Sequence, residues 1–233
     1  MAVTVDSVID RVQTVLQDTT GVRWPVDAEL VLWINDAQRE IALLKPDASA
    51  CTYKVELDVG TRQNIPADGN RLLKVVRNVT SANEGRRAIR LVGGEVLDSQ
   101  SPDWHDPNVG GDASHGSEVK HYVYNESSPR TFYVYPGVSG AAATAGVFIE
   151  LIYSSNPTTV ESGAGNHLSL PDIYANAVMN YVLYMCYMKD AEFAGNSQRG
   201  ANHYQLFTAS ITGKGQIDTL TNPNADAAAV API

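Results

Sequence analysis

The residues best suited to chemistry lie in one polar loop. Its carboxylates include Asp98, Asp103 and Asp106, and its two imidazoles are His105 and His115. Both groups are common ligands of divalent metals. Their spacing matches no known ligand pattern, and an exposed polar loop in which Asp and Gly form turns explains the same residues. We therefore predict no metal site and no cofactor.

Catalytic motifs are otherwise missing from the sequence. It lacks GxGxxG, GxxxxGK, HExxH, CxxC and GxSxG. Ser117 and Lys120 have the SxxK spacing of serine acylases, but that motif works at the start of a buried helix and here it opens a predicted strand. His121, His167 and His203 have no matched partners in the sequence. We predict that the protein is not an enzyme and has no catalytic residue.

The composition is that of a folded protein. The chain has 233 residues, of which 44% are hydrophobic and 18% charged, enough for one large domain or two small ones. No apolar run is long enough to cross a bilayer, and residues 1–6 do not resemble a signal peptide. We expect a soluble protein without membrane contact, made and kept in the cytosol. Cys51 and Cys186 lie far apart in sequence, which favours reduced thiols over a disulfide.

The charge is unevenly distributed. The net charge of -9 disfavours general binding to nucleic acid or anionic membranes. Residues 70–91 nevertheless carry a net +5, which leaves -14 on the rest of the chain. This basic arm has three possible meanings: solvated strand faces, contact with an acidic neighbouring subunit, or contact with DNA phosphates. Its candidate partner contacts are Arg86, Arg87 and Arg90.

Apolar periodicity predicts helices at both ends of the chain and strands between them. Helical spacing occurs at residues 5–16, 27–45, 173–193 and 201–213, with Thr4 or Asp6 as the first cap and Ser169 as a later one. Strand-like segments lie at 53–59, 72–79, 88–92, 119–124, 131–135 and 147–153.

This order predicts an α+β protein in which an antiparallel β-rich domain is inserted into a four-helix bundle. The helical bundle domain comprises residues 1–49 and 156–213, and the inserted β domain comprises 50–155. Residues 214–233 form an extended C-terminal tail with few apolar anchors. Ordering its backbone costs about 20 to 40 kcal/mol, whereas burying its main apolar side chains returns about 6 to 12. We therefore expect the tail to be disordered alone and to be held by another chain through Ile217, Leu220, Val230 and Ile233.

Several motifs, in this order and spacing, resemble the adaptor (head-to-tail connector) proteins of short-tailed bacteriophages, of the tail-tubular-protein-A-like kind. The resemblance covers residues 5–212 and leaves out the tail. The motifs are WINDAQRE at 33–40, KPDA at 45–48, VGTRQNIPADG at 59–69, FYVYP at 132–136, LPDIY at 170–174, YMKDAE at 187–192 and ANHY at 201–204.

The resemblance implies a structural virion protein at the head-tail interface, assembled in the host cytoplasm. Its partners would be copies of itself in a dodecameric ring, the portal protein above and the tail nozzle protein below. Genomic DNA would pass through the lumen during ejection without specific binding. The alternative is a glycan-binding or carbohydrate-active tail component, in which Trp104, Tyr122, Tyr124, Tyr133 and Tyr135 stack on sugars.

Overall fold

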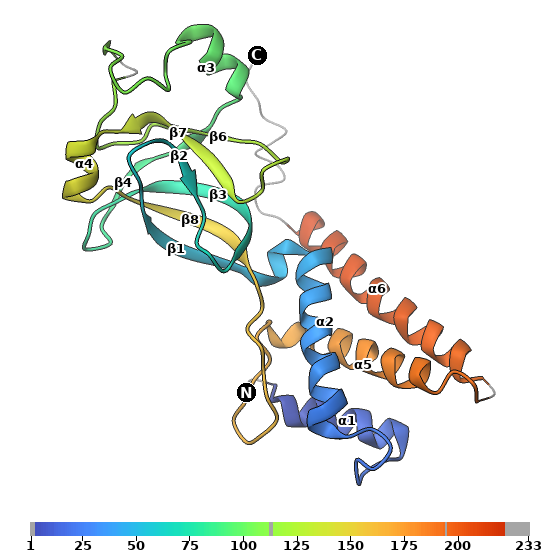
Figure 1. The fold of residues 1–233 in the computed structure, drawn as a ribbon. Coiled ribbons are helices and arrows are strands. Elements are labelled where there is room, and N and C mark those ends of the chain that lie inside the picture. Colours follow the sequence, from blue (N-terminus) through green and yellow to red (C-terminus); the bar gives the residue numbers. More distant parts are fainter. Residues whose placement is uncertain (1–2, 112–113, 194, 222–233) are drawn as a thin grey trace. The chain divides into compact units, whose positions relative to one another are not determined.

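The computed structural model describes residues 3–111, 114–193 and 195–221. The chain divides into two compact units: Met1–Ala48 with Pro157–Ile233, and Ser49–Asn156. The first unit is helical and the second is built on two β-sheets (Figure 1). We call them the helical unit and the β unit.

The helical unit contains segments from both ends of the chain. The apolar stripe predicted for residues 5–16 is buried in α1, and the Thr4 hydroxyl caps this helix by accepting a hydrogen bond from the Ser7 backbone N–H at 3.1 Å. The elements are α1 (Val5–Leu16), a π-helical turn η1 (Val26–Leu30), α2 (Val31–Leu44), the 3-10 turns η2 (Pro46–Ser49) and η4 (Asp172–Tyr174), α5 (Ala175–Lys189) and α6 (Asn196–Leu220).

The prediction of a four-helix bundle is wrong. The helix α5 packs against each of α1, α2 and α6, so the unit is organised around α5 and not around a core shared equally by four helices (Figure 1). The sequence of α5 explains this arrangement, because the helix is apolar over most of its circumference. Ala177, Val182 and Cys186 are all buried. A helix of this kind can accept three partners at once.

A loop after the last strand is fastened to α2 by two buried amides. The side chain of Asn35 donates to the backbone carbonyl of Val160 at 2.9 Å and accepts from its N–H at 2.8 Å. The Gln38 side-chain oxygen accepts from the backbone N–H groups of Ser169 and Leu170 at 2.7 and 3.3 Å. Ser169 is therefore not the cap that was predicted; α5 begins at Ala175 after the turn η4.

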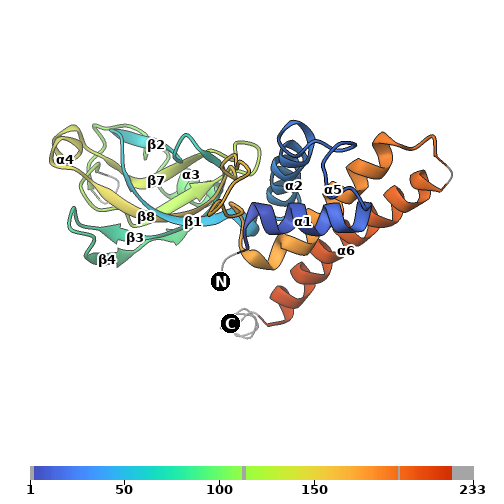
Figure 2. The same ribbon diagram turned by 90° about the horizontal axis from the view of Figure 1, so that it is seen from below.

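The β unit contains two four-stranded sheets, with strand orders β1-β8-β3-β4 and β2-β7-β6-β5. Figure 2 shows β1, β8, β3 and β4 in one layer and β2 and β7 in another. The strands are β1 (Ala50–Glu56), β2 (Gly60–Asn64), β3 (Gly69–Val79), β4 (Gly85–Ala88), β5 (Arg90–Leu91), β6 (His121–Tyr124), β7 (Thr131–Val138) and β8 (Phe148–Ser155).

Apolar side chains from both sheets form one core. Val75 pairs with Leu151 across β3 and β8, Tyr122 pairs with Val134 across β6 and β7, and all four are buried in the same cluster. Alternation along each strand directs one face inward, as the sequence period predicts. The antiparallel arrangement holds for every neighbouring pair except β5 and β6, which are parallel.

Two short helices in the β unit were not predicted. Helix α3 (Gly94–Gln100) lies in what the sequence indicates as a loop, and α4 (Gly140–Ala145) precedes β8 and is capped by the Ser139 hydroxyl. Across residues 3–111, 114–193 and 195–221, no helix is long and apolar enough to cross a membrane.

Candidate assembly surfaces

The basic arm, residues 70–91, runs from β3 through β4, the last strand of the first sheet, to β5, the last strand of the second sheet. All residues of β4 are exposed, including Arg86 and Arg87. Arg90 lies on β5 and is exposed as well. Within the described residues, the side chains of Arg86 and Arg90 have no hydrogen bond or ion pair, and Arg87 lies 4.0 Å from Glu118. Cations on an edge strand disfavour unspecific pairing with strands of other chains. They favour binding to an acidic partner instead.

One buried amide holds this arm in place. Asn78 on β3 is 3% exposed, and its side-chain nitrogen donates to the backbone carbonyls of Arg87 at 3.0 Å and Val119 at 2.7 Å. Its side-chain oxygen accepts from the Val119 N–H at 3.0 Å. These three bonds tie β4 to the segment before β6. Asn78 was not singled out from the sequence, because nothing in its neighbourhood marks it as buried.

A polar hollow lies beside the arm. It has a volume of about 420 Å³ and is lined by residues that include Arg86, Ser117, Glu118 and Phe148. Ser117 is exposed and lies outside any helix, so the SxxK spacing of Ser117 and Lys120 has no helical context here.

The Asp and His residues of the predicted polar loop serve its packing. The indole N–H of Trp104 donates to the Asp98 carboxylate at 2.9 Å, and His105 Nδ1 lies 2.8 Å from the Thr61 hydroxyl. The His115 ring packs so closely on Gly137 that a Cβ atom added to this glycine would lie 2.6 Å from the ring. Over the described ranges, no three His, Cys, Asp or Glu side chains are placed to hold a metal ion.

The aromatic residues proposed for stacking on sugars are mostly interior. Trp104, Tyr122 and Tyr135 are 3%, 6% and 8% exposed. Tyr133 contacts the Trp104 ring edge-on, with centroids 6.3 Å apart. The three buried rings contribute to the core, whereas Tyr124 and Tyr133 are half-buried.

His121 lies in the same region as the basic arm. Burial lowers the pKa of His121 below its ordinary value of 6.5, and the charges of Arg87, Arg90 and Lys120 lower it further. Its Nδ1 is buried without a hydrogen-bond partner among the described residues. The folded β unit therefore favours the neutral imidazole.

We expect the β unit to lose stability as the pH falls from about 7.5 to about 5.5. A histidine whose folded pKa lies below its unfolded value binds more protons when unfolded, so its contribution is present above about pH 6.5 and is lost below it. Hydrogen exchange of the β6 and β7 peptides measures this loss. The His121→Gln variant is expected to weaken the pH dependence, whereas His167→Gln, at an exposed position of the helical unit, is expected to leave it unchanged. An unaltered dependence in His121→Gln would contradict the assignment.

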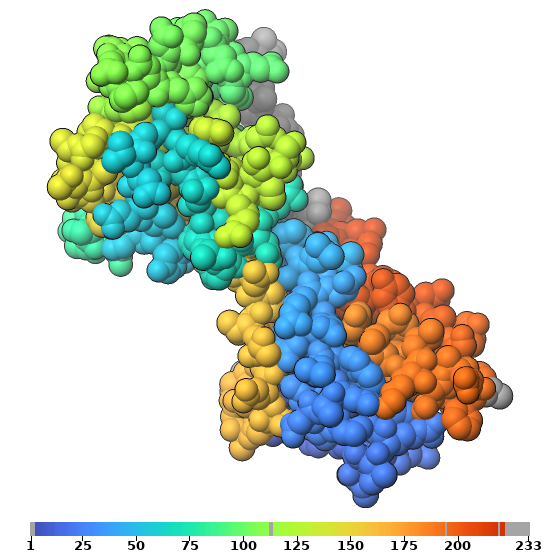
Figure 3. All heavy atoms as spheres, viewed as in Figure 1, coloured from blue at the N-terminus to red at the C-terminus, as the bar shows by residue number. Residues whose placement is uncertain are grey.

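The helix α6 extends past its predicted end at Gly213 and continues to Leu220. Of the predicted tail contacts, Ile217 and Leu220 therefore lie on this helix, 61% and 83% exposed. Val230 and Ile233 lie outside the described residues. In the space-filling view, the side chains of α2 and α6 lie next to each other on the surface of the helical unit (Figure 3).

Charge also separates between the two units. The helical unit contains fourteen acidic and seven basic residues, a net charge of -7, and the β unit contains twelve and ten, a net charge of -2. The -14 outside the basic arm is therefore divided equally, with -7 on the helical unit and -7 on the rest of the β unit. The β unit is nearly neutral overall only because it also holds the basic arm at +5.

Exposed charged and apolar surfaces on two folded units are features of a structural assembly protein. The model of the SU10 adaptor protein family matches residues 3–228. The chain therefore belongs to the SU10 adaptor protein family, which confirms the resemblance to phage adaptors and makes the protein a structural component of the virion. No curated protein sequence matches the chain.

Proposed function

We propose that the protein forms a ring that joins the portal to the tail nozzle and lines the DNA exit channel. The observation that carries this proposal is the exposed basic strand β4, whose Arg86 has no ion pair with any described residue, on a chain of net charge -9. A subunit with opposite charges at separate places can contact copies of itself head to tail. Heterologous contacts of that kind close into rings.

The acidic helical unit is suited to a DNA channel. Genomic DNA must slide through the ring during ejection, and a basic lumen would retain it through counterion release. A unit with a net charge of -7 repels phosphates instead. We propose assembly in the host cytoplasm before the virion is complete.

The exposed end of α6 is proposed to contact a partner. Ile217 and Leu220 are large apolar side chains in solvent, and the residues that follow them carry Val230 and Ile233. The partner of these four residues is a neighbouring adaptor or the portal. Membership of an adaptor family supports both.

The function is tested by mixing the full-length protein with the portal protein. We expect light scattering after size-exclusion chromatography to show a portal complex with many adaptor copies, and electron microscopy to show a closed ring whose copies can be counted. A protein that stays monomeric and has no affinity for the portal would overturn the proposal.

Charge reversal of the basic arm is expected to prevent ring assembly. In the variant Arg86→Glu, Arg87→Glu, Arg90→Glu, an acidic partner surface would face carboxylates, and association should weaken by about 100-fold or more because like charges are brought together. Analytical ultracentrifugation over a concentration series measures this change.

A matched control reverses three exposed cations that lie outside residues 70–91. The variant Arg11→Glu, Arg62→Glu, Arg130→Glu has the same net charge as the arm variant. We expect it to assemble nearly as the natural protein does. Equal assembly of both variants would show that the arm makes no specific contact.

A further inference from the structure

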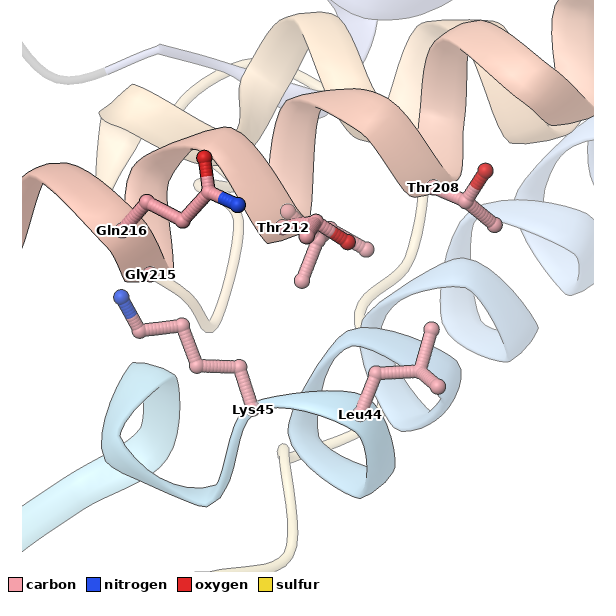
Figure 4. A pocket seen from close by; sticks show the side chains of 7 residues that line it. Leu44, Lys45, Thr208, Thr212, Gly215 and Gln216 are labelled. Carbon is pink, nitrogen blue, oxygen red and sulfur yellow. The ribbon is translucent and has the colours of Figure 1, made fainter.

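A groove lies on the helical unit between the end of α2 and the face of α6. It has a volume of about 500 Å³ and is lined by Leu44, Lys45, Thr208, Ile211, Thr212, Gly215 and Gln216. Figure 4 shows Leu44 and Lys45 facing Thr208, Thr212 and Gln216 across an open space. This volume is typical of sites that hold a small ligand or a few residues of a peptide.

The groove has an apolar wall and a charged end. Leu44 is 49% exposed and faces the same hollow as Ile211, which is 5% exposed. At the end of α6, the ammonium groups of Lys45 and Lys214 both contact the carboxylate of Asp218. These contacts hold the pKa of Asp218 below its ordinary range. Two cations share one anion, so this cluster retains one positive charge.

We infer that this groove receives residues 222–233 of a second copy of the chain. The inference rests on the proposed ring and identifies the surface that holds the tail. The segment contains Val230, Pro232 and Ile233, which suit the apolar wall, and Asp226 as its one charged residue, which suits the positive end. Small apolar anchors in a shaped groove give a specific contact although each contributes little.

The course of α6 favours a second copy over the same chain. The helix continues beyond the last groove residue, Gln216, to Leu220, and Asp218 fastens this part to Lys45. The end of α6 therefore lies beyond the groove. Residues 222–233 of the same chain could bind in the groove only if the chain reversed its direction after the helix. Twelve extended residues span up to about 40 Å, enough to reach an adjacent subunit.

Directed disulfide crosslinking between two full-length chains tests the inference. Both chains carry Cys51→Ser, while Cys186 is kept because its thiol is buried and its pKa is raised to about 12, so it stays unreactive. One tagged chain carries Thr212→Cys and the other carries Val230→Cys. We expect the mixed disulfide dimer to form about tenfold or more above the yield from a chain with Ser210→Cys, because docking raises the effective concentration. Ser210 is exposed like Thr212 but lies about 200° away around α6.

Substitutions at two glycines of α6 test whether filling the groove prevents the crosslink. Apart from the helix's own backbone, a Cβ atom added at Gly215 or Gly213 would have no atom of the described residues within 4 Å, and of the two glycines Gly215 lines the groove. Gly215→Met in the Thr212→Cys chain is expected to reduce the mixed dimer to the Ser210 level, and Gly213→Met to leave it unchanged. Both changes favour the helix, so loss of folding does not explain a difference.

A further chain carries both Thr212→Cys and Val230→Cys and reports crosslinking within one copy. Three results would overturn the inference: equal yields at positions 212 and 210, no effect of Gly215→Met, or a disulfide that forms within this double-cysteine chain but not between the two single-cysteine chains. Light scattering on the same samples separates this from the proposed function. Rings that bind the portal without the Thr212 crosslink would refute the tail contact alone. Absence of rings and of portal binding would refute the function itself.

Discussion

Replacing Asn78 by alanine is expected to lower the free energy of unfolding of the β unit by about 3–5 kcal/mol. The change removes three hydrogen bonds, two buried ones to the backbone N–H and carbonyl of Val119 and a part-buried one to the carbonyl of Arg87. Each unsatisfied buried group costs about 1–3 kcal/mol. Urea denaturation followed by hydrogen exchange of the β3 and β6 peptides measures the loss.

The same variant should release the basic arm. Since Asn78 binds the Arg87 carbonyl, β4 should exchange its amides faster than the rest of the sheet, and ring assembly should weaken even where the unit stays folded. Asn64→Ala is the control, because Asn64 is exposed and its side chain bonds only to the Thr131 hydroxyl among the described residues. A stability loss under about 1 kcal/mol in Asn78→Ala would show that the network has little importance.

Replacing Phe207 by alanine is expected to cost the helical unit about 3–5 kcal/mol, since a fully buried aromatic ring is removed and a cavity remains. Phe207 is 0% exposed and its ring lies 5.1 Å from that of Tyr181, centroid to centroid, joining α6 to α5. Circular dichroism at the helical band during urea denaturation reports the change.

The adjacent residue provides the comparison for Phe207. Leu206 is 53% exposed, so Leu206→Ala should change the free energy of unfolding by no more than about 0.5 kcal/mol. Similar losses in the two variants would mean that α6 is not held to α5 through Phe207.

Local patterns in the sequence identify elements better than they identify partners. The stripe of α1 and the alternation of the strands are visible because each element shows its own buried face. The prediction of a four-helix bundle was wrong because the apolar residues of α5 do not indicate how many helices pack against them. Ser169 resembles a helix cap, but its hydroxyl accepts from the Thr158 N–H at 2.9 Å instead.

Of the two candidate surfaces, the basic arm could be located from the sequence and the groove could not. The charge count locates Arg86, Arg87 and Arg90, and the structure places them on exposed strands, but their partner contacts stay a prediction. The groove could not be predicted, because Gly213 and Gly215 indicate the end of a helix. In the structure, α6 continues through both glycines, and beyond them Asp218 forms ion pairs with Lys45 and Lys214. Lys45 and Asp218 lie far apart in sequence, so local patterns do not reveal this pair.

The division of the helical unit between both ends of the chain imposes an order on its synthesis. When α1 and α2 leave the ribosome, α5, the helix on which they pack, has not been made, because all of Ser49–Asn156 is translated first. The β unit, by contrast, is complete when its last strand emerges, and contiguous domains generally fold as units during translation. The β unit can therefore fold while the two N-terminal helices still expose their apolar faces. Val8, Ile34 and Ile41, which are fully buried in the complete helical unit, would then need protection in the nascent chain.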